Sequence, residues 1–555
     1  MEGAIGVATH HDGMSGTERQ SVADDYSQRI SEGHFEVEAG VAKSLQKLTG
    51  ITGEIGHCNC NSAGNCRNMS MCAYTTGQDE FTVIAWNPLG QNISSFLRIP
   101  VSGASYTVTD LAAHVQLPSQ TTVIDARTKQ LPLLYLNKYR LSAAAVAKAQ
   151  EALANNASHV LTFEAALPPV GYSTFRIKKS STTTTSSLST SNITTTSRTP
   201  IVVTNGVYSI TVDQESGYVS SVKNLASGIS TDLNISWGYY VSNEGDRASD
   251  QASGAYMFRP AGQSTHSCNV NHSKPTVEVT SGPLVSEIKQ RFSDWATHTI
   301  RLTKGSNFIE VEWTAGPIPM TPPPQPPPPP PMNSNLSGKW NAENGRALAT
   351  IVEGSDGNFT VSDPDGAGWK AASGKITGRH VAITYNTGDK ETGIISPGNA
   401  NIKWDDGTLW SRQGAANAPG HLGGGKEVVL QINSALVSNG TFYTDSNGRE
   451  MVLRRRNARG PSYPPYVVGE PVAGNYYPVN SMISLDDGET ELAVVVDTTM
   501  GGSSTKDGSL EVMLHRRCLH DDGRGVQEPL NGALPTLLTC CTTLRVHVLR
   551  LVFCK

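Results

Sequence analysis

The sequence predicts a mainly β protein that begins with a helical segment and continues into β-sandwich domains, with one small β domain inserted. Three observations lead to this fold class: helical spacing of apolar residues before residue 50, short β-rich runs from about residue 80, and a proline-rich stretch followed by a compact β pattern. With 555 residues, 37% of them hydrophobic, the chain is long enough for about two to four separate cores.

The helical segment is expected to start at a capping motif. Ser15 and Glu18 are spaced so that each side chain can bind an unpaired amide at the start of a helix. Apolar residues then follow at helical spacing, first Val22, Tyr26 and Ile30, and after a break near Gly33 a second set, Val37, Val41, Leu45 and Leu48. Gly50 ends the pattern. We therefore expect two packed helices.

From about residue 80 the sequence changes to runs rich in Val, Ile, Thr, Tyr and Phe, such as residues 81–86, separated by turn dipeptides. This pattern predicts β-sandwiches. Residues 142–154 are rich in alanine and are consistent with either a short helix or an ordered loop. The Ser/Thr tract at 180–199 cannot bury apolar area, so we expect a flexible or O-glycosylated linker and a domain boundary there.

A second boundary is marked by proline. Residues 322–331 are proline except for Gln325, and such a run forms a stiff polyproline II spacer. A compact β pattern follows at 336–413, as though a small module had been inserted. Its tryptophans suit either carbohydrate stacking or the core of a small sheet, and we favour the core: Trp340, Trp369, Trp404 and Trp410.

The charge balance argues against nucleic acid or an anionic membrane as partner, because 44 basic and 49 acidic residues give a net charge of -5. The apolar stretch from Leu534 to Cys554 is interrupted by Arg545, His547 and Arg550, so we expect no membrane span. No signal peptide is visible after Met1.

Nine cysteines are present, and four of them are clustered at Cys58, Cys60, Cys66 and Cys72. Their spacing does not repeat the paired C-x-x-C pattern of structural zinc sites, so local disulfides in an oxidising compartment are favoured over a metal. Glycosylation sequons point the same way with less weight, at Asn68, Asn92, Asn156, Asn192, Asn234, Asn271, Asn335, Asn358 and Asn439.

A specific string occurs at residues 8–20, which read ATHHDGMSGTERQ. Further motifs follow in order: WNPLG at 86–90, SDQASGAY at 249–256, GPIP at 316–319, GTFYTDSNGRE at 440–450, EPVAGNYYP at 470–478, GGSS at 501–504 and DDGRGVQEPL at 521–530. Together they resemble the glycoside hydrolase family 38 α-mannosidases, in the wording of the lysosomal branch. The resemblance covers residues 3–318 and 425–530.

The resemblance implies a division of the chain into eight parts. These are the end of a catalytic domain at 1–14, a remnant of an α-helical bundle at 15–76, a β-sandwich domain at 77–179, the Ser/Thr-rich linker at 180–199, a large β-sandwich or supersandwich formed by 200–319 and 425–530, the Pro-rich spacer at 320–335, the inserted β module at 336–413, and an unmatched tail at 531–555.

The activity that the resemblance implies is zinc-dependent, retaining hydrolysis of terminal α-mannose residues from glycans. In that scheme His11 is a Zn²⁺ ligand, Asp12 binds sugar hydroxyls, and His10 is a neighbouring support. The nucleophile, the acid/base carboxylate and the other zinc ligands are expected before Met1. We therefore expect this chain to be inactive on its own.

Other residues carried over by the resemblance would contact the sugar. One of Tyr476 and Tyr477 could stack on mannose, the other being core. Arg517, Asp522 and Arg524 lie in a block that reaches the same pocket, although a charged surface hairpin explains them equally well.

The expected partners are mannose-containing oligosaccharides or glycoproteins, in the lysosome or secretory pathway. The sequence leaves open whether the chain forms a homo-oligomer. A non-enzymatic alternative also stays open, in which the chain is a carbohydrate-binding or structural β protein derived from a mannosidase.

Overall fold

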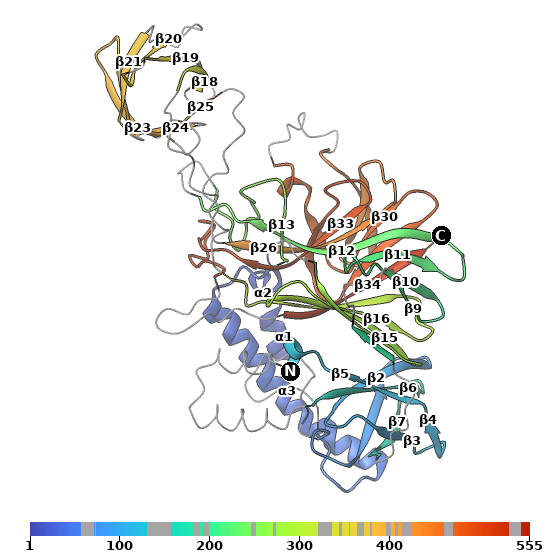
Figure 1. Ribbon diagram of the computed structural model, residues 1–555. Coiled ribbons are helices and arrows are strands. Elements are labelled where there is room, and N and C mark those ends of the chain that lie inside the picture. Colours follow the sequence, from blue (N-terminus) through green and yellow to red (C-terminus); the bar gives the residue numbers. More distant parts are fainter. Residues whose placement is uncertain are drawn as a thin grey trace. The chain divides into compact units, whose positions relative to one another are not determined.

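The computed structural model describes residues 1–56, 72, 74–129, 157–180, 189–192, 199–245, 251–269, 274–319, 336–342, 347–354, 356–362, 371–377, 380–395, 401–405, 409–412, 425–459, 470–531 and 545–554. They belong to two compact units (Figure 1). The first unit comprises Met1–Ser242, Ala252–Met320 and Gly425–Lys555, and the second comprises Asn243–Gln251 and Thr321–Gly424. The predicted fold class is confirmed, because antiparallel sheets follow an N-terminal helical segment.

Several expectations fall outside the described residues. These are the alanine-rich stretch at 142–154, the proline run at 322–331, Trp369, and the cysteines Cys58, Cys60, Cys66, Cys540 and Cys541. Cys72 is described, buried and disulfide-bonded. Cys268 and Cys518 are buried free thiols.

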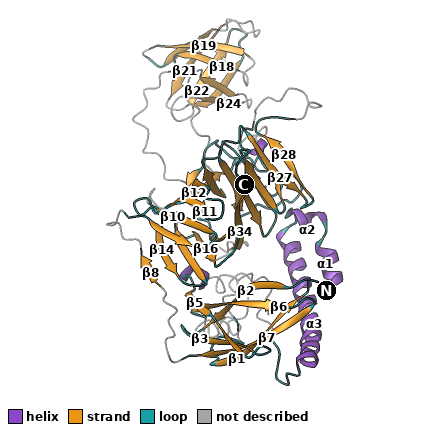
Figure 2. Cartoon of the chain, turned by 90° about the vertical axis from the view of Figure 1, so that its right-hand side faces the viewer, coloured by secondary structure: helices purple, strands orange, loops and turns teal. Residues whose placement is uncertain are grey.

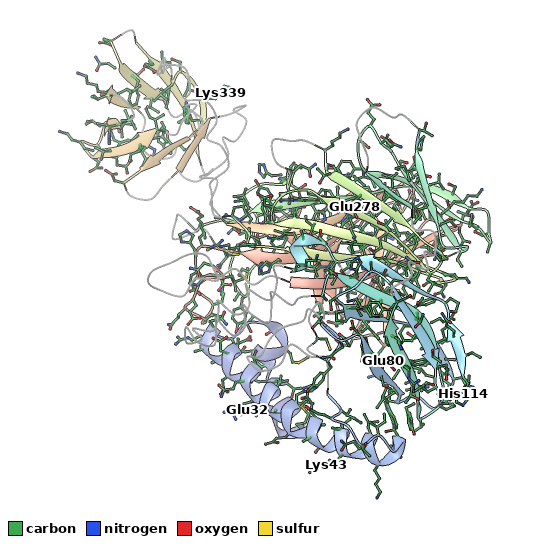
Figure 3. The ribbon with its side chains drawn as sticks, turned by 60° about the horizontal axis from the view of Figure 1, so that its bottom comes forward. Glu32, Lys43, Glu80, His114, Glu278 and Lys339 are labelled. Carbon is green, nitrogen blue, oxygen red and sulfur yellow. The ribbon has the colours of Figure 1, made fainter. Side chains whose placement is uncertain are left out.

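One long helix, α3 (Gln20–Thr49), replaces the two helices expected from the sequence. The predicted break was wrong because Gly33 serves packing: it is buried, and a Cβ there would lie 3.0 Å from Met1 Cα. The short helix α1 (Glu2–Ala8) packs against α3 at this level (Figure 2). Glu32 and Lys43 are exposed on the same long helix (Figure 3).

The capping box was also predicted wrongly. Ser15 ends the short helix α2 (His11–Ser15), and its hydroxyl donates to the His11 carbonyl at 2.7 Å. The N-cap of α3 is Arg19, which makes no side-chain cap bond. A distant residue takes over this role, because the Gln20 amide donates to Glu528 Oε2 at 2.9 Å.

A small β-sandwich follows the helices. Its first sheet has the order β1-β7-β3-β4 and its second the order β2-β6-β5. The strands are β1 (Glu80–Asn87), β2 (Ile93–Val101), β3 (Tyr106–Asp110), β4 (Val115–Leu117), β5 (Ser119–Val123), β6 (His159–Leu167) and β7 (Gly171–Lys179). Alternate residues such as Phe163, Phe175 and Ile177 are fully buried between the sheets, as period-2 strands require.

The remainder of the first unit is a larger sandwich. Its first sheet runs β29-β32-β33-β26-β12-β11-β10-β9, with β13 paired to β12. These strands are β9 (Ile201–Thr204), β10 (Tyr208–Val212), β11 (Val219–Asn224), β12 (Ser230–Val241), β13 (His266–Ser267), β26 (Lys426–Ser434), β29 (Tyr477–Val479), β32 (Met500–Ser503) and β33 (Ser509–Arg517).

The second sheet of this sandwich runs β28-β27-β30-β31-β34-β17-β16-β15-β14-β8. These strands are β8 (Ser189–Asn192), β14 (Thr276–Ser281), β15 (Val285–Arg291), β16 (Ala296–Thr303), β17 (Ile309–Ala315), β27 (Thr441–Ser446), β28 (Glu450–Arg455), β30 (Met482–Asp486), β31 (Glu491–Val496) and β34 (Arg545–Cys554). One continuous core, which includes Trp237 and Trp313, fills the space between the two sheets.

The C-terminal apolar stretch contributes a central strand. Strand β34 pairs with both β17 and β31, antiparallel to each. Within the described part of the chain, none of the helices is both long and apolar enough to cross a membrane.

A cluster of charged side chains joins the two sandwiches. Arg98 of β2 contacts Glu310 and Glu312 of β17, each at 3.1 Å, and Arg301 of β16 lies against the same two carboxylates. Burial alone would raise the pKa of Glu312, but the two guanidinium groups outweigh it and lower the value to about 2. The Glu312 carboxylate therefore stays ionised in mild acid.

The second unit is a closed antiparallel barrel of strands β18 to β25. The strands are β18 (Gly338–Ala342), β19 (Ala347–Glu353), β20 (Asn358–Ser362), β21 (Ala371–Thr377), β22 (His380–Tyr385), β23 (Lys390–Ile395), β24 (Asn401–Trp404) and β25 (Leu409–Arg412). Trp340, Trp404 and Trp410 are at most 2% exposed in its core, so the core prediction is confirmed for these three.

Candidate functional site

The candidate site begins at the turn between α1 and α2. His10 is the N-cap of α2, and His11 and Asp12 open that helix. The side chains lie close together, with 3.9 Å between His10 Nε2 and Asp12 Oδ2 and 4.0 Å between His11 Nε2 and Asp12 Oδ1. One donor atom from each residue lies within 4.8 Å of the others. Imidazole nitrogen and carboxylate oxygen are donors that zinc accepts, so this cluster suits a metal.

Exposure distinguishes the three side chains. The His11 side chain is 86% exposed, whereas those of His10 and Asp12 are 42% and 30% exposed. The His10 Nδ1 atom lies 3.1 Å from the Tyr26 hydroxyl of α3. His10 is therefore held against the helix, while the His11 ring is free to meet a group from solvent.

Asp12 is held by two hydroxyl groups. Thr17 Oγ1 donates to Asp12 Oδ1 at 3.0 Å, and Tyr256 Oη donates to the same oxygen at 3.3 Å. Burial raises the pKa of the nearby Glu18, and the Asp12 carboxylate adds to this rise.

Tyr256 was not expected as a site residue, although its motif was part of the resemblance. It lies in residues 251–260, which we call the Tyr256 loop, and its side chain is 48% exposed. No local signal marks it, because its contact with Asp12 spans 244 positions in the sequence. The position of Tyr256 inside a specific motif was the one signal that could have identified it as a site residue.

Asp522 holds the backbone of this loop. Its Oδ2 atom accepts the Tyr256 amide at 2.6 Å and the Met257 amide at 3.0 Å, and the residue is only 4% exposed. The approach requires a glycine at position 254, because a Cβ there would lie 2.7 Å from Asp522 Cβ. The Asp522 carboxylate thus binds backbone amides in this structure, and its contact with a sugar remains a prediction.

Neighbouring residues fasten the same block to α3. Arg19 Nε donates to the Val526 carbonyl at 3.0 Å, beside the bond from the Gln20 amide to Glu528. Arg524 is exposed, and its own amide donates to Asp522 Oδ1 at 3.2 Å. The structure thus brings Asp12, Asp522 and Arg524 into one region.

The remaining predicted residues lie deeper. Arg517 is 4% exposed and donates from Nε to the Asn531 carbonyl at 3.1 Å and from Nη1 to the Ile318 carbonyl. Tyr476 lies beneath the Tyr256 loop, where its hydroxyl donates to Glu511, and burial raises its pKa well above the usual value. Tyr477 faces the sandwich core, with its ring against Phe442.

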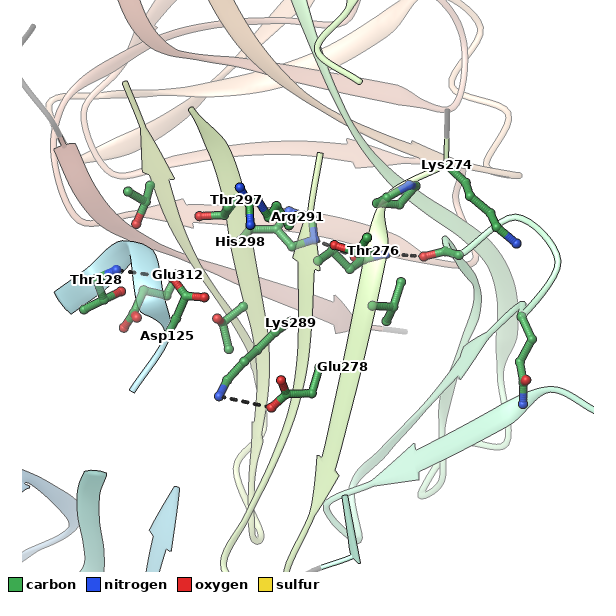
Figure 4. A pocket seen from close by; sticks show the side chains of 17 residues that line it. Asp125, Thr128, Lys274, Thr276, Glu278, Lys289, Arg291, Thr297, His298 and Glu312 are labelled. Carbon is green, nitrogen blue, oxygen red and sulfur yellow. Dashed lines mark hydrogen bonds and ion pairs between the residues drawn. The ribbon is translucent and has the colours of Figure 1, made fainter. Parts of the chain in front are cut away.

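A separate hollow of about 450 Å³ opens beside β14 to β17 (Figure 4). No residue predicted from the sequence lines it. Some of its charged groups are paired within the protein: Lys289 lies 3.7 Å from Glu278, and Glu312 pairs with Arg98. Burial lowers the pKa of His298, in the same lining, to about 3, so this ring is neutral. We therefore place the candidate site at His11 and Asp12.

The chain is similar to known proteins over most of its length. Residues 203–316 and 400–524 match the family described as Glycosyl hydrolases family 38 C-terminal domain. The chain is 30% identical to lysosomal α-mannosidase of Bos taurus over 95% of its length, and 29% identical to that of Homo sapiens over 96%. It is 30% identical to an α-mannosidase of Canavalia ensiformis over 95% of its length.

The chain spans 38%, 39% and 43% of the length of these three relatives. Among solved structures, an α-mannosidase from Enterococcus faecalis aligns over 100% of this chain and 50% of that chain, with a TM-score of 0.44 and 10% identity. From the sequence matches, this chain carries the C-terminal domain of glycoside hydrolase family 38 and is related to the α-mannosidases of that family along nearly its whole length.

Proposed function

We propose that this chain provides part of a zinc-dependent α-mannosidase site that removes terminal α-mannose residues from glycans with retention of configuration. His11 would bind Zn²⁺ through an imidazole nitrogen, and the zinc, when bound, would polarise sugar hydroxyls. Asp12, Tyr256 and Arg524 would hold the sugar. The lysosome is the expected compartment, as named for two of the curated relatives.

The observation that carries this proposal is the contact of Tyr256 with Asp12 in the cluster of His10, His11 and Asp12. An exposed imidazole beside a carboxylate that already accepts two hydroxyl donors suits a site for a polyol on a metal. Asp522, Arg517, Tyr476 and Tyr477 are assigned to the support of the site, because their side chains are occupied by protein partners.

We expect the 555-residue chain to show no turnover by itself. Retaining glycosidases need two carboxyl groups about 5–5.5 Å apart on either side of the scissile bond. The donor cluster among the described residues contains a single carboxylate, that of Asp12. We assign neither the nucleophile nor the acid/base residue to this chain.

Zinc content tests the proposal. In a protein that joins this chain to the part expected to supply the other zinc ligands, about one Zn²⁺ should bind, and His11→Ala should lose it, because the exposed imidazole is removed. His34→Ala is the matched control, since His34 lies on α3 and pairs with Glu38 at 3.1 Å. Metal analysis after dialysis gives the stoichiometry, and unchanged zinc in His11→Ala would refute the ligand assignment.

The non-catalytic alternative predicts a different result. A chain acting only as a carbohydrate binder should bind mannose oligosaccharides equally well with and without Zn²⁺. The buried tryptophans of the barrel give this alternative no support, because their faces are covered by the core.

A further inference from the structure

The Tyr256 loop is held by side chains of β26 and β33 as well as by Asp522. Arg516 of β33 donates from Nη2 to the Met257 carbonyl at 2.6 Å. The Ser253 hydroxyl, at the start of the loop, lies 3.2 Å from Glu427 Oε2 and accepts the Arg259 amide at 2.7 Å. Two charged side chains of the sheet therefore contact the loop at two separate points.

Glu427 and Arg516 form one buried ion pair. They stand opposite each other in the register of β26 and β33, and Arg516 donates to Glu427 Oε1 from Nε at 2.9 Å and from Nη2 at 2.6 Å. Glu427 is 0% exposed, and the Arg516 side chain is 18% exposed. A carboxylate this deep in a sheet is costly unless it is fully paired, so the pair fixes the geometry around it.

Aromatic packing fixes the rest of the loop. The Phe258 ring lies edge-on to Tyr476 at 4.7 Å and to Tyr240 at 5.7 Å between centroids. Phe258 directly follows Met257, whose carbonyl Arg516 binds. The side chain of Tyr256, two residues earlier, is left pointing to Asp12, with its hydroxyl 3.3 Å from Oδ1.

We propose that the buried Glu427–Arg516 pair is a positioning element that holds Tyr256 against Asp12. The inference rests on the proposed function, because the position of Tyr256 matters only if Asp12 and Tyr256 bind a sugar beside zinc. The guanidinium fork is required, since one group must bind Glu427 and the Met257 carbonyl at once. Neither residue touches the sugar in this scheme, so both act through Tyr256.

The test uses the complete 555-residue chain. Arg516→Met removes the fork, and Arg516→Lys keeps the charge but offers a single ammonium that cannot reproduce both contacts. Arg454→Met is the matched control: Arg454 lies on strand β28, 4.3 Å from the ring centroid of Tyr477, and Arg516 lies 6.0 Å from the ring centroid of Phe258. Hydrogen exchange of the Tyr256 and Met257 amides is measured by mass spectrometry, with thermal unfolding to confirm folding.

We expect exchange of these two amides to rise about tenfold or more in Arg516→Met and by less in Arg516→Lys, with no change in Arg454→Met. If Arg516→Met does not fold, the lysine variant decides. Protection equal to wild type in a folded Arg516 variant would overturn the proposal.

A second measurement connects the pair to the site. In the same joined protein that carries the other expected zinc ligands, Zn²⁺ affinity is compared in wild type, Arg516→Lys, Tyr256→Phe and the double variant. If Arg516 acts through Tyr256, the lysine change weakens zinc binding by up to about tenfold in the wild-type background and not in Tyr256→Phe. Additive losses would overturn the positioning role. Absence of zinc binding in wild type would refute the proposed function, while the exchange result would still decide the positioning.

Discussion

Asp445 shows how a single carboxylate can stabilise a β protein in acid. Its oxygens accept the backbone amides of Gly448, Asn480, Ser481 and Met482 at 2.6 to 3.0 Å. Burial alone would raise its pKa, but these bonds outweigh burial and lower the pKa from 3.8 to about 2. The carboxylate therefore joins the end of β27 to the start of β30.

This geometry predicts a pH-dependent loss in Asp445→Asn. Because the folded-state pKa is depressed, the stabilisation is fully present above the unfolded value of about 3.9 and is lost as pH falls through about 2. At pH 7 the variant should be less stable by about 2 kcal/mol, and the difference should shrink below pH 3. Urea unfolding at several pH values measures it. Asp486→Asn, at the exposed end of β30, should show no comparable effect, and a constant difference down to pH 2 would contradict the assignment.

At the scale of single residues, the sequence predicts His11 and Asp12 as site residues and misses Tyr256. His11 and Asp12 stand in one continuous motif, so their proximity follows from chain connectivity. Tyr256 reaches Asp12 only through folding of the large sandwich, and no periodicity in the sequence encodes that contact. An aspartate is usually exposed, so the sequence alone suggests that Asp522 lies at the surface. Its carboxylate is instead buried and bound to backbone amides, because Gly254 has no side chain to block it.

Among elements, α3 shows where local rules fail. Glycine near the middle of an amphipathic pattern usually lowers helix stability by about 1 kcal/mol, which favoured a break at Gly33. Tertiary packing overrides this cost, because α1 approaches Gly33 closely. The β segments were easier to predict, since period-2 alternation and turn dipeptides reflect burial on one face of each strand.

Two glycines of α3 give a paired prediction. A Cβ at Gly40 would meet nothing within 4 Å, so Gly40→Ala should stabilise the chain by up to about 1 kcal/mol. Gly33→Ala should gain less, because its Cβ would lie 3.0 Å from Met1 Cα and α1 would have to shift. Thermal unfolding of both variants compares the gains. An equal gain at both positions would show that the approach of α1 does not constrain Gly33.

At the scale of the whole molecule, residues 321–424 form an insertion in the first unit, which we call the host, and the two ends of the insertion lie close together in the host. Strand β17 ends at Ala315 and β26 begins at Lys426, and Lys426 Nζ donates to the Pro319 carbonyl at 2.8 Å. The sequence predicted the insertion from the proline run, and its barrel topology was beyond prediction because closure depends on the pairing of β18 with β25. Each unit encloses its own core.

Separate cores predict separate folding. Replacing residues 320–424 by a three-residue glycine-serine linker should leave the host transition within about 3 °C of its original midpoint, the shift expected for roughly 1 kcal/mol. In the intact chain, Trp410→Ala should destabilise only the barrel, by about 3–5 kcal/mol, because Trp410 is 1% exposed and packs on Trp404 at 5.2 Å. Calorimetry resolves the two transitions. A host core that is complete without the barrel should unfold independently of it. Loss of the host transition on deletion would therefore mean that the barrel is part of the host's folding unit.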